Sequence, residues 1–252
     1  MHANKFGSFF VLTLAVSIAL AVCAITPGKV TAGGAPSFSG AANLKGTVHF
    51  EGTVPKPKPI NMAADPSCAK QHSAPVYLQE VMTDSKGDLQ NVIVFISQGL
   101  GDRRFDPPTQ PVTVEQKGCM YVPHVLAVQA NQPLHVVNED PTSHNIHPTP
   151  ANNREWNKAE PPGSTMDESF AREEIAIPVK CNLHPWMHGF VAVFKHPYFA
   201  VTGKDGSFDL TGLPPGTYTI KAWHEKLGTA TQTITIGANE SKEISFVFKA
   251  AM

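Results

Sequence analysis

The sequence is poor in charge. Only 16% of its 252 residues are charged, and 20 lysines and arginines nearly balance 21 aspartates and glutamates. It contains no basic run, so the electrostatic footprint of a nucleic-acid-binding protein is missing. Low charge together with 19 glycines and 22 prolines argues against a helical bundle and favours short strands joined by turns. We therefore expect an all-β protein that does not bind nucleic acid.

Long apolar runs are also scarce, and the single one lies near the N-terminus. Lys5 precedes an apolar run at residues 9–25, and small residues follow at 30–33. This order is typical of a secretory signal peptide, and the run is near the lower length limit for a membrane span. We expect residues 1–32 to be a signal peptide and the mature protein to be periplasmic or secreted, with no membrane span. A membrane anchor is the alternative.

Several catalytic signatures are missing. The sequence has no serine or cysteine nucleophile in a hydrolase motif and no glycine loop of the phosphate-binding type. It also lacks the C-x-x-C-H motif by which c-type haem is attached. These absences argue against a hydrolase, a nucleotide-binding enzyme and a c-type cytochrome.

Alternating or continuous apolar segments predict strands along the rest of the chain. The expected strands are residues 45–50, 76–82, 91–97, 112–116, 125–129, 133–138, 175–181, 189–195, 199–202, 207–210, 217–223, 229–236 and 242–248. Residues 140–165 are expected to form a long loop. The Lys-Asp-Gly sequence at 204–206 predicts a hairpin turn between the strands on either side of it.

The residues that carry chemistry are concentrated in two short segments. Cys181, His184 and Met187 lie within seven residues of one another, and His144 lies upstream in a segment that also contains His147. Two imidazoles and a thiolate with a weak axial methionine are the ligands of a blue-copper site. Zinc is the alternative, because cysteine and histidine suit it as well and a further histidine could complete its four ligands.

Residues 112–195 resemble a cupredoxin, most closely in the ligand loop of the amicyanin and plastocyanin group. The resemblance runs through Asn138-Glu139-Asp140, then His144-Asn145-Ile146-His147, and ends with C-x-x-H-P-x-M-x-G-x-V-x-V from Cys181. It implies a Greek-key β-sandwich with one type 1 copper ion. By position, the resemblance makes His144, Cys181 and His184 the equatorial ligands, Met187 the axial ligand and Asn145 a brace between the ligand loops.

The same resemblance implies how the site would be used. His184 is expected at the surface, ringed by Pro185 and Trp186, where a redox partner such as a cytochrome or a dehydrogenase would dock. His147 and His188 are additional histidines close to the ligands. Either could add a ligand and convert an electron relay into a catalytic copper centre.

The other cysteines have a separate explanation. Cys23 would leave with the signal peptide, so Cys68 and Cys119 most simply form a disulfide in an exported protein. The alternative is a second metal site that combines these two cysteines with His72 and His124.

The flanks of the chain have a resemblance of their own. Residues 202–223 resemble a carboxypeptidase regulatory-like or transthyretin-like β-sandwich, and Gly46-Thr47-Val48 fits the first strand of such a domain. We expect residues 44–100 and 196–250 to fold together as a second small sandwich, with the cupredoxin at 110–195 inserted between them. His224 and Glu225 are expected to be surface strand residues.

These features lead to one main functional hypothesis. The protein is expected to be an exported type 1 copper protein that carries single electrons between periplasmic redox partners, and not an enzyme. One alternative is a mononuclear copper enzyme, or an oxidase accessory, with an open copper position. The other is an extracellular binding module in which a metal only stabilises the fold.

Overall fold

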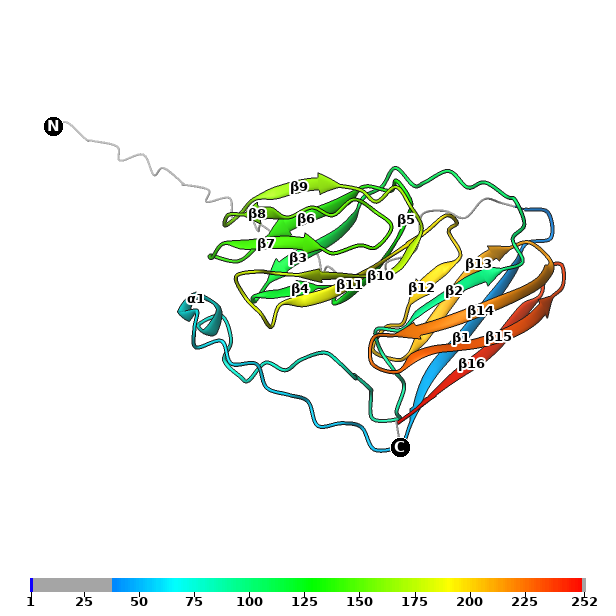
Figure 1. The fold of residues 1–252 in the computed structure, drawn as a ribbon, viewed down its shortest axis with the longest axis horizontal. Coiled ribbons are helices and arrows are strands. Elements are labelled where there is room, and N and C mark those ends of the chain that lie inside the picture. The colour runs from blue at the N-terminus through cyan, green and yellow to red at the C-terminus, as the bar shows by residue number, and fades with distance from the viewer. Residues whose placement is uncertain (2–37, 251–252) are drawn as a thin grey trace. The chain divides into compact units, whose positions relative to one another are not determined.

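The structure is a computed structural model that describes Met1 and residues 38–250. Within those residues it contains sixteen strands and one helix of four residues, which confirms the expected all-β fold (Figure 1). None of the described residues forms a helix long and apolar enough to cross a membrane. The expected signal peptide, apart from Met1, lies outside the described residues.

One β-sandwich, here called the flanking sandwich, is built from both flanks of the sequence (Figure 1). Its sheets have the strand orders β13-β1-β16 and β12-β2-β14-β15. Its strands are β1 (Ala42–Glu51), β2 (Ile93–Gln98), β12 (Phe199–Val201), β13 (Ser207–Leu213), β14 (Gly216–His224), β15 (Gly228–Ile236) and β16 (Ser241–Lys249). Because β1 pairs in parallel with β16 and antiparallel with β13, the first described strand completes a sheet with the last.

The alternation of β1 explains why it forms a strand. Leu44, Val48 and Phe50 are buried in the core of the flanking sandwich, whereas Lys45, Thr47 and His49, which alternate with the buried positions, are more exposed. A strand turns successive side chains to opposite faces, so this period of two places one face in the core.

The second sandwich, here called the central sandwich, is formed by the chain between β2 and β12. Its sheets have the strand orders β4-β3-β6-β9 and β5-β11-β10-β7-β8. Its strands are β3 (Val112–Lys117), β4 (Met120–Val122), β5 (Val125–Gln129), β6 (Leu134–Asn138), β7 (His144–Pro148), β8 (Lys158–Glu160), β9 (Thr165–Glu168), β10 (Glu174–Lys180) and β11 (His188–Phe194). The expected long loop at 140–165 is wrong in part, because β7 and β8 pair with each other inside it.

Strand β11 belongs to two hydrophobic clusters. Val191 and Val193 lie in the core of the central sandwich, whereas Ala192 and Phe194 lie in a cluster with Ile93 of β2 and other residues of the flanking sandwich. Because β11 is buried on both faces, its sequence is a nearly continuous apolar run instead of an alternating one.

Residues 52–91 leave β1 and return to β2 without forming a further strand. They contain the short helix α1 (Pro66–Ala69) and isolated bridges such as Pro59 with Tyr77. The expected strand at 76–82 is therefore wrong. Its β-forming residues find no neighbouring strand with which to form a continuous ladder, and most of them stay only half-buried.

The expected hairpin at 204–206 is also wrong. A turn is present, with Gly206 at φ 62° and its amide donating to the carbonyl of Gly203. However, β12 pairs with β2 and β13 pairs with β1, so the turn carries the chain from one sheet of the flanking sandwich to the other.

Candidate metal centre

The ligand loop follows β10 directly and is closed by its own backbone. The amide of Cys181 donates to the carbonyl of Met187 at 3.0 Å, and the amide of Met187 donates to the carbonyl of His184 at 2.9 Å. These two bonds hold residues 181–187 in a tight loop before β11 begins. The loop thereby fixes three of the expected ligands, Cys181, His184 and Met187, relative to one another.

Cys181 lies on the inner face of the central sandwich together with Ile177 and Val179. The period of two predicts this orientation for positions 177, 179 and 181. It fails at Ile175, which packs into the other cluster, because a register shift with Ala176 at φ 59° interrupts the ladder. A bulge of this kind changes the face to which the preceding residues point.

His144 is brought to the same place by β7 and by the turn before it. Asn138, the last residue of β6, donates to the carbonyls of Thr142 and Glu160. The carboxylate of Asp140 accepts from the amides of Gly118 and Cys119 at 2.6 and 2.7 Å. This buried network fixes the turn on which His144 stands.

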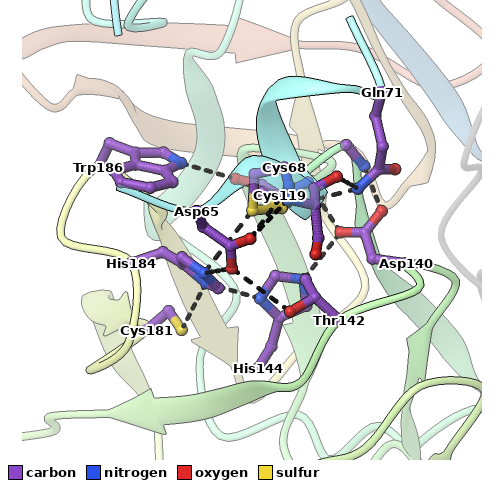
Figure 2. The surroundings of a disulfide bond; sticks show 12 residues. Asp65, Cys68, Gln71, Cys119, Asp140, Thr142, His144, Cys181, His184 and Trp186 are labelled. Carbon is purple, nitrogen blue, oxygen red and sulfur yellow. Dashed lines mark hydrogen bonds and ion pairs between the residues drawn. A yellow bond between two sulfur atoms is a disulfide. The ribbon is translucent and has the colours of Figure 1, made fainter. Parts of the chain in front are cut away.

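The donor atoms of His144, Cys181 and His184 converge in the interior. They all lie within 4.8 Å of one another. Nδ1 of His144 is 2.9 Å from Nδ1 of His184, and Sγ of Cys181 is 3.7 Å from that second nitrogen (Figure 2). All three residues are buried, and His184 is only 4% exposed.

Each imidazole is oriented by a carboxylate at its other nitrogen. Nε2 of His144 lies 2.8 Å from Oδ2 of Asp140, and Nε2 of His184 lies 2.9 Å from Oδ2 of Asp65 (Figure 2). With Nε2–H donated to a carboxylate, each ring is left with a lone pair on Nδ1. Two lone pairs that face each other at 2.9 Å repel unless a proton or a metal cation lies between them, so the two Nδ1 atoms can accommodate a bound cation in place of a proton.

Electrostatics favour the deprotonated cysteine. Burial raises the pKa of Cys181, but hydrogen bonds from His144 and from neighbouring backbone amides outweigh it and lower the pKa to about 6. Burial opposes the charged form of His144, but Asp140 and Cys181 together raise the pKa of His144 to about 9. The hydrogen bond with His184 is the main reason that the pKa of Asp65 falls to about 2. The thiolate is the form that binds a metal.

Two further expected residues contact Cys181, Met187 through its backbone carbonyl and Asn145 through its side chain. Met187 is completely buried in the core cluster that contains Cys181. Oδ1 of Asn145 accepts from the amide of Asn182 at 2.7 Å and, when Cys181 is protonated, from its Sγ at 3.4 Å. Asn145 on β7 is thus tied to the loop that follows β10.

The two additional histidines point elsewhere. His147 bonds to Glu155 and Asn182, and it does not belong to the convergent group. His188 groups with His124 and Glu225 instead, because successive residues at the start of β11 face opposite sides. The structure therefore supports neither as an extra ligand beside Cys181.

Cys68 and Cys119 form a disulfide. The alternative second metal site of Cys68, His72, Cys119 and His124 is therefore wrong, because both thiols are consumed. His72 bonds to the carbonyl of Gly118, and the ring of His124 lies against the carboxylate of Glu225.

The disulfide attaches α1 over the ring of His184 (Figure 2). Sγ of Cys68 is 3.6 Å from Nε2 of His184, and Asp65 caps the N-terminus of α1 by accepting from the amides of Ser67 and Cys68. Helix α1 and its disulfide, here called the α1 cap, cover the edge of the His184 ring. The expectation of a surface-exposed His184 is therefore wrong. Pro185 stays exposed, whereas Trp186 is half-buried and donates from Nε1 to the carbonyl of Cys119.

Asp65 and Asp140 were not expected as site residues. Asp140 stands four residues before His144, and a carboxylate that close to a ligand histidine is a readable signal. Asp65 is 119 residues from His184. The only sequence signal for it is indirect, because Asp65-Pro66-Ser67 is a helix start beside a cysteine expected to be paired.

The donor set fits copper better than zinc. Two imidazole nitrogens and one thiolate would be three strong ligands, and the buried methionine would be a fourth, weak one. This is the donor set of a blue-copper site. A structural zinc site requires a fourth cysteine, histidine or carboxylate as a ligand. The nearest carboxylates, Asp65 and Asp140, are bonded to the far nitrogens of the rings.

The similar solved structures include a copper-containing enzyme, a cupredoxin and an amicyanin. One is a copper-containing nitrite reductase from Thermus scotoductus SA-01, with 22% identity and a TM-score of 0.32 over 38% of this chain and 24% of that one. This chain thus spans about a quarter of that enzyme. A purple cupredoxin from Nitrosopumilus maritimus is 22% identical over 32% of this chain and 97% of that one, with a TM-score of 0.28. A mutant of amicyanin in its Cu(I) form is 17% identical over 40% and 97%, with a TM-score of 0.31.

A search of the curated proteins finds no match. A family model does match the C-terminal part of the chain. Residues 191–249, which contain β12 to β16, match the carboxypeptidase regulatory-like domain, as the resemblance of residues 202–223 predicts.

Proposed function

We propose that the central sandwich binds one copper ion and exchanges single electrons with a redox protein outside the cytoplasm. The observation that carries this proposal is the convergence of the two Nδ1 atoms with Sγ of Cys181 in a buried site. Met187 would be the weak axial ligand. Bound copper would supply a one-electron couple by alternating between Cu(I) and Cu(II).

The chain's own residues suit this task because they restrict the movement of the ligands. Both imidazoles are held at the far nitrogen by a carboxylate, and Asn145 joins the two ligand segments. Ligands that do not move when the charge changes keep the reorganisation energy of electron transfer low. Burial also keeps water away from the thiolate.

Burial distinguishes this function from its main alternative. An enzyme with an open copper position needs a path for a substrate to the metal. Here His144, Cys181, His184 and Met187 are all buried, and the α1 cap lies over His184. Two cavities among the described residues, near Arg103 and near Arg172, are lined by segments other than the ligand loops. The geometry therefore favours an electron carrier.

The experiment is to load the purified protein with Cu(II) and record its optical and EPR spectra. We expect an intense visible thiolate-to-copper charge-transfer band and one copper per chain. Cys181→Ser should remove the band, whereas Ser97→Ala, far from the site on β2, should leave it unchanged. A pale spectrum that responds to small anions would instead indicate an open, enzyme-like site. No copper uptake would leave a structural binding module.

A further inference from the structure

A second group of metal-binding side chains lies outside the copper centre. His124 precedes β5, His188 begins β11, and Glu225 stands in the turn between β14 and β15. Their donor atoms all lie within 4.8 Å of one another. Two of the residues belong to the central sandwich and the third to the flanking sandwich.

Backbone hydrogen bonds select the same tautomer in both imidazoles. Nδ1 of His124 lies 3.1 Å from the carbonyl oxygen of His188, and Nδ1 of His188 lies 3.0 Å from that of Trp186. A carbonyl only accepts, so each Nδ1 must carry the proton. The lone pair of each ring is then on Nε2. Metal-binding histidines show this same pattern, because a fixed N–H orients the opposite nitrogen toward the ion.

The carboxylate in this group is buried beside one of those lone pairs. The side chains of His124 and Glu225 are 2% and 3% exposed, and Nε2 of His124 is 2.5 Å from Oε1 of Glu225. Two acceptors at that separation repel, and a buried carboxylate is costly without a compensating positive charge. A second proton on His124 or a bound cation would remove the repulsion between Nε2 of His124 and Oε1 of Glu225. Only a cation would also bind Nε2 of His188.

We propose that His124, His188 and Glu225 form a second metal site, which binds a divalent transition metal of the zinc class. Two imidazoles and one carboxylate are a zinc ligand set, and a water molecule would complete the four-coordinate shell. The site has no sulfur donor, so it would not compete with the copper centre for Cu(I). Adjacent residues of one chain would serve the two centres, since Met187 faces the core and His188 faces the flanking sandwich.

The consequence is a metal link between the two sandwiches. Glu225 belongs to the flanking sandwich, whereas His124 and His188 belong to the central one. An ion that binds the folded protein and not the unfolded chain stabilises the folded state, and the effect grows with its excess over the dissociation constant. Zinc should therefore raise the unfolding temperature, and its removal should lower it.

The test uses zinc alone and a Cys181→Ala background, which removes the thiolate of the copper centre. Equilibrium dialysis against zinc, followed by metal analysis, should give one zinc per chain for Cys181→Ala. It should give none for Cys181→Ala with Glu225→Gln, a substitution that keeps the side-chain volume. Glu155→Gln, an exposed carboxylate beside His147, is the matched control and should retain the zinc.

Two further measurements make the result decisive. Zinc should raise the unfolding temperature of Cys181→Ala but not that of its Glu225→Gln partner. Diffraction at the zinc absorption edge should show a peak between the three side chains. Circular dichroism checks the fold of each metal-free variant, and His188→Gln replaces Glu225→Gln if the latter does not fold. Zinc retained in both variants, or no zinc in Cys181→Ala, would overturn the proposal.

Discussion

The ring of His184 is paired with the carboxylate of Asp65, with 2.9 Å between Nε2 and Oδ2. The same carboxylate caps α1 by accepting from the amides of Ser67 and Cys68. One aspartate therefore does two things: it starts a helix and orients a proposed copper ligand. The helix that covers the ring and the group that holds the ring are parts of one structure.

Asp65→Asn separates these two roles. Asparagine is as good an N-cap as aspartate, so α1 should persist, but the negative charge on the far side of His184 is lost. Loss of such a supporting partner typically lowers metal affinity by about 10- to 100-fold. Competition with a chromophoric Cu(I) chelator measures this. Asp106→Asn, in an exposed linker, should keep wild-type affinity, and an unchanged affinity in Asp65→Asn would show that the carboxylate does not support the ligand.

Removing the disulfide should loosen the cap. A cross-link between residues 51 positions apart contributes about 4 kcal/mol in the chain-entropy model, so Cys68→Ala with Cys119→Ala should lower the free energy of unfolding by up to that amount. A chelator should also extract copper faster, because α1 is no longer tied down over His184. A reducing agent should reproduce both effects in the wild type and add nothing in the double variant. Equal extraction rates would mean that α1 stays in place without the disulfide.

The sequence predicts the four proposed copper ligands but not the α1 cap that covers His184. His144, Cys181, His184 and Met187 form short local patterns, in which residue type and spacing carry the chemistry, and the structure gathers three donor atoms of this set. The cap could not be predicted in the same way. The pairing of Asp65 with His184 depends on the path of residues 52–91, which contain no long periodic element.

The fold shows the same distinction between local and long-range information. The alternation of β1 predicts a strand, and its tertiary partners determine that it lies between β13 and β16. Residues 76–82 have strand-forming side chains but no neighbour with which to pair in a continuous ladder. At 204–206 the turn chemistry is correct, but the strands on either side of the turn pair in different sheets.

If the proposed electron transfer is correct, the exposed contact for the redox partner should include Leu183. This side chain is 58% exposed and stands beside His184 and Pro185. Leu183→Asp should slow electron exchange with a partner about 10-fold or more, because a charge is placed at an apolar contact, and it should leave the optical spectrum unchanged. Val247→Asp, an equally apolar exposed site on β16, is the control. Equal slowing in both variants would place the contact elsewhere.

The buried His196 should make stability depend on pH. Burial lowers the pKa of His196 to about 4 from an ordinary value of 6.5, so between these values the unfolded chain binds a proton that the folded protein does not. The free energy of unfolding should therefore fall as pH decreases from about 6.5 to 4, by up to about 3 kcal/mol. His196→Gln should flatten that part of the curve in denaturant titrations.

Gly46 should be irreplaceable at the pairing of β1 with β16. A Cβ at this position would lie 1.9 Å from the carbonyl oxygen of Ile244 and 2.7 Å from the ring of Phe208. Gly46→Ala should cost about 3 kcal/mol or more, because backbone must move to relieve the overlap. Gly203→Ala is the matched control, since its new Cβ would meet only Asp205 at 3.5 Å. Thermal unfolding of the two variants should differ clearly, and equal midpoints would contradict the tight approach.

The path of the chain has a consequence for proteolysis. Three connections join the two sandwiches: residues 52–91 with their disulfide to Cys119, the linker at 99–111, and the short link at 195–198. A protease that cuts once in any of them releases neither sandwich, because the other two connections persist. The β1 and β16 strands also hold the ends of the flanking sandwich together. A nicked molecule would therefore separate into two fragments only after denaturation, and a nick between Cys68 and Cys119 would require reduction as well. Until then it would keep its proposed copper centre.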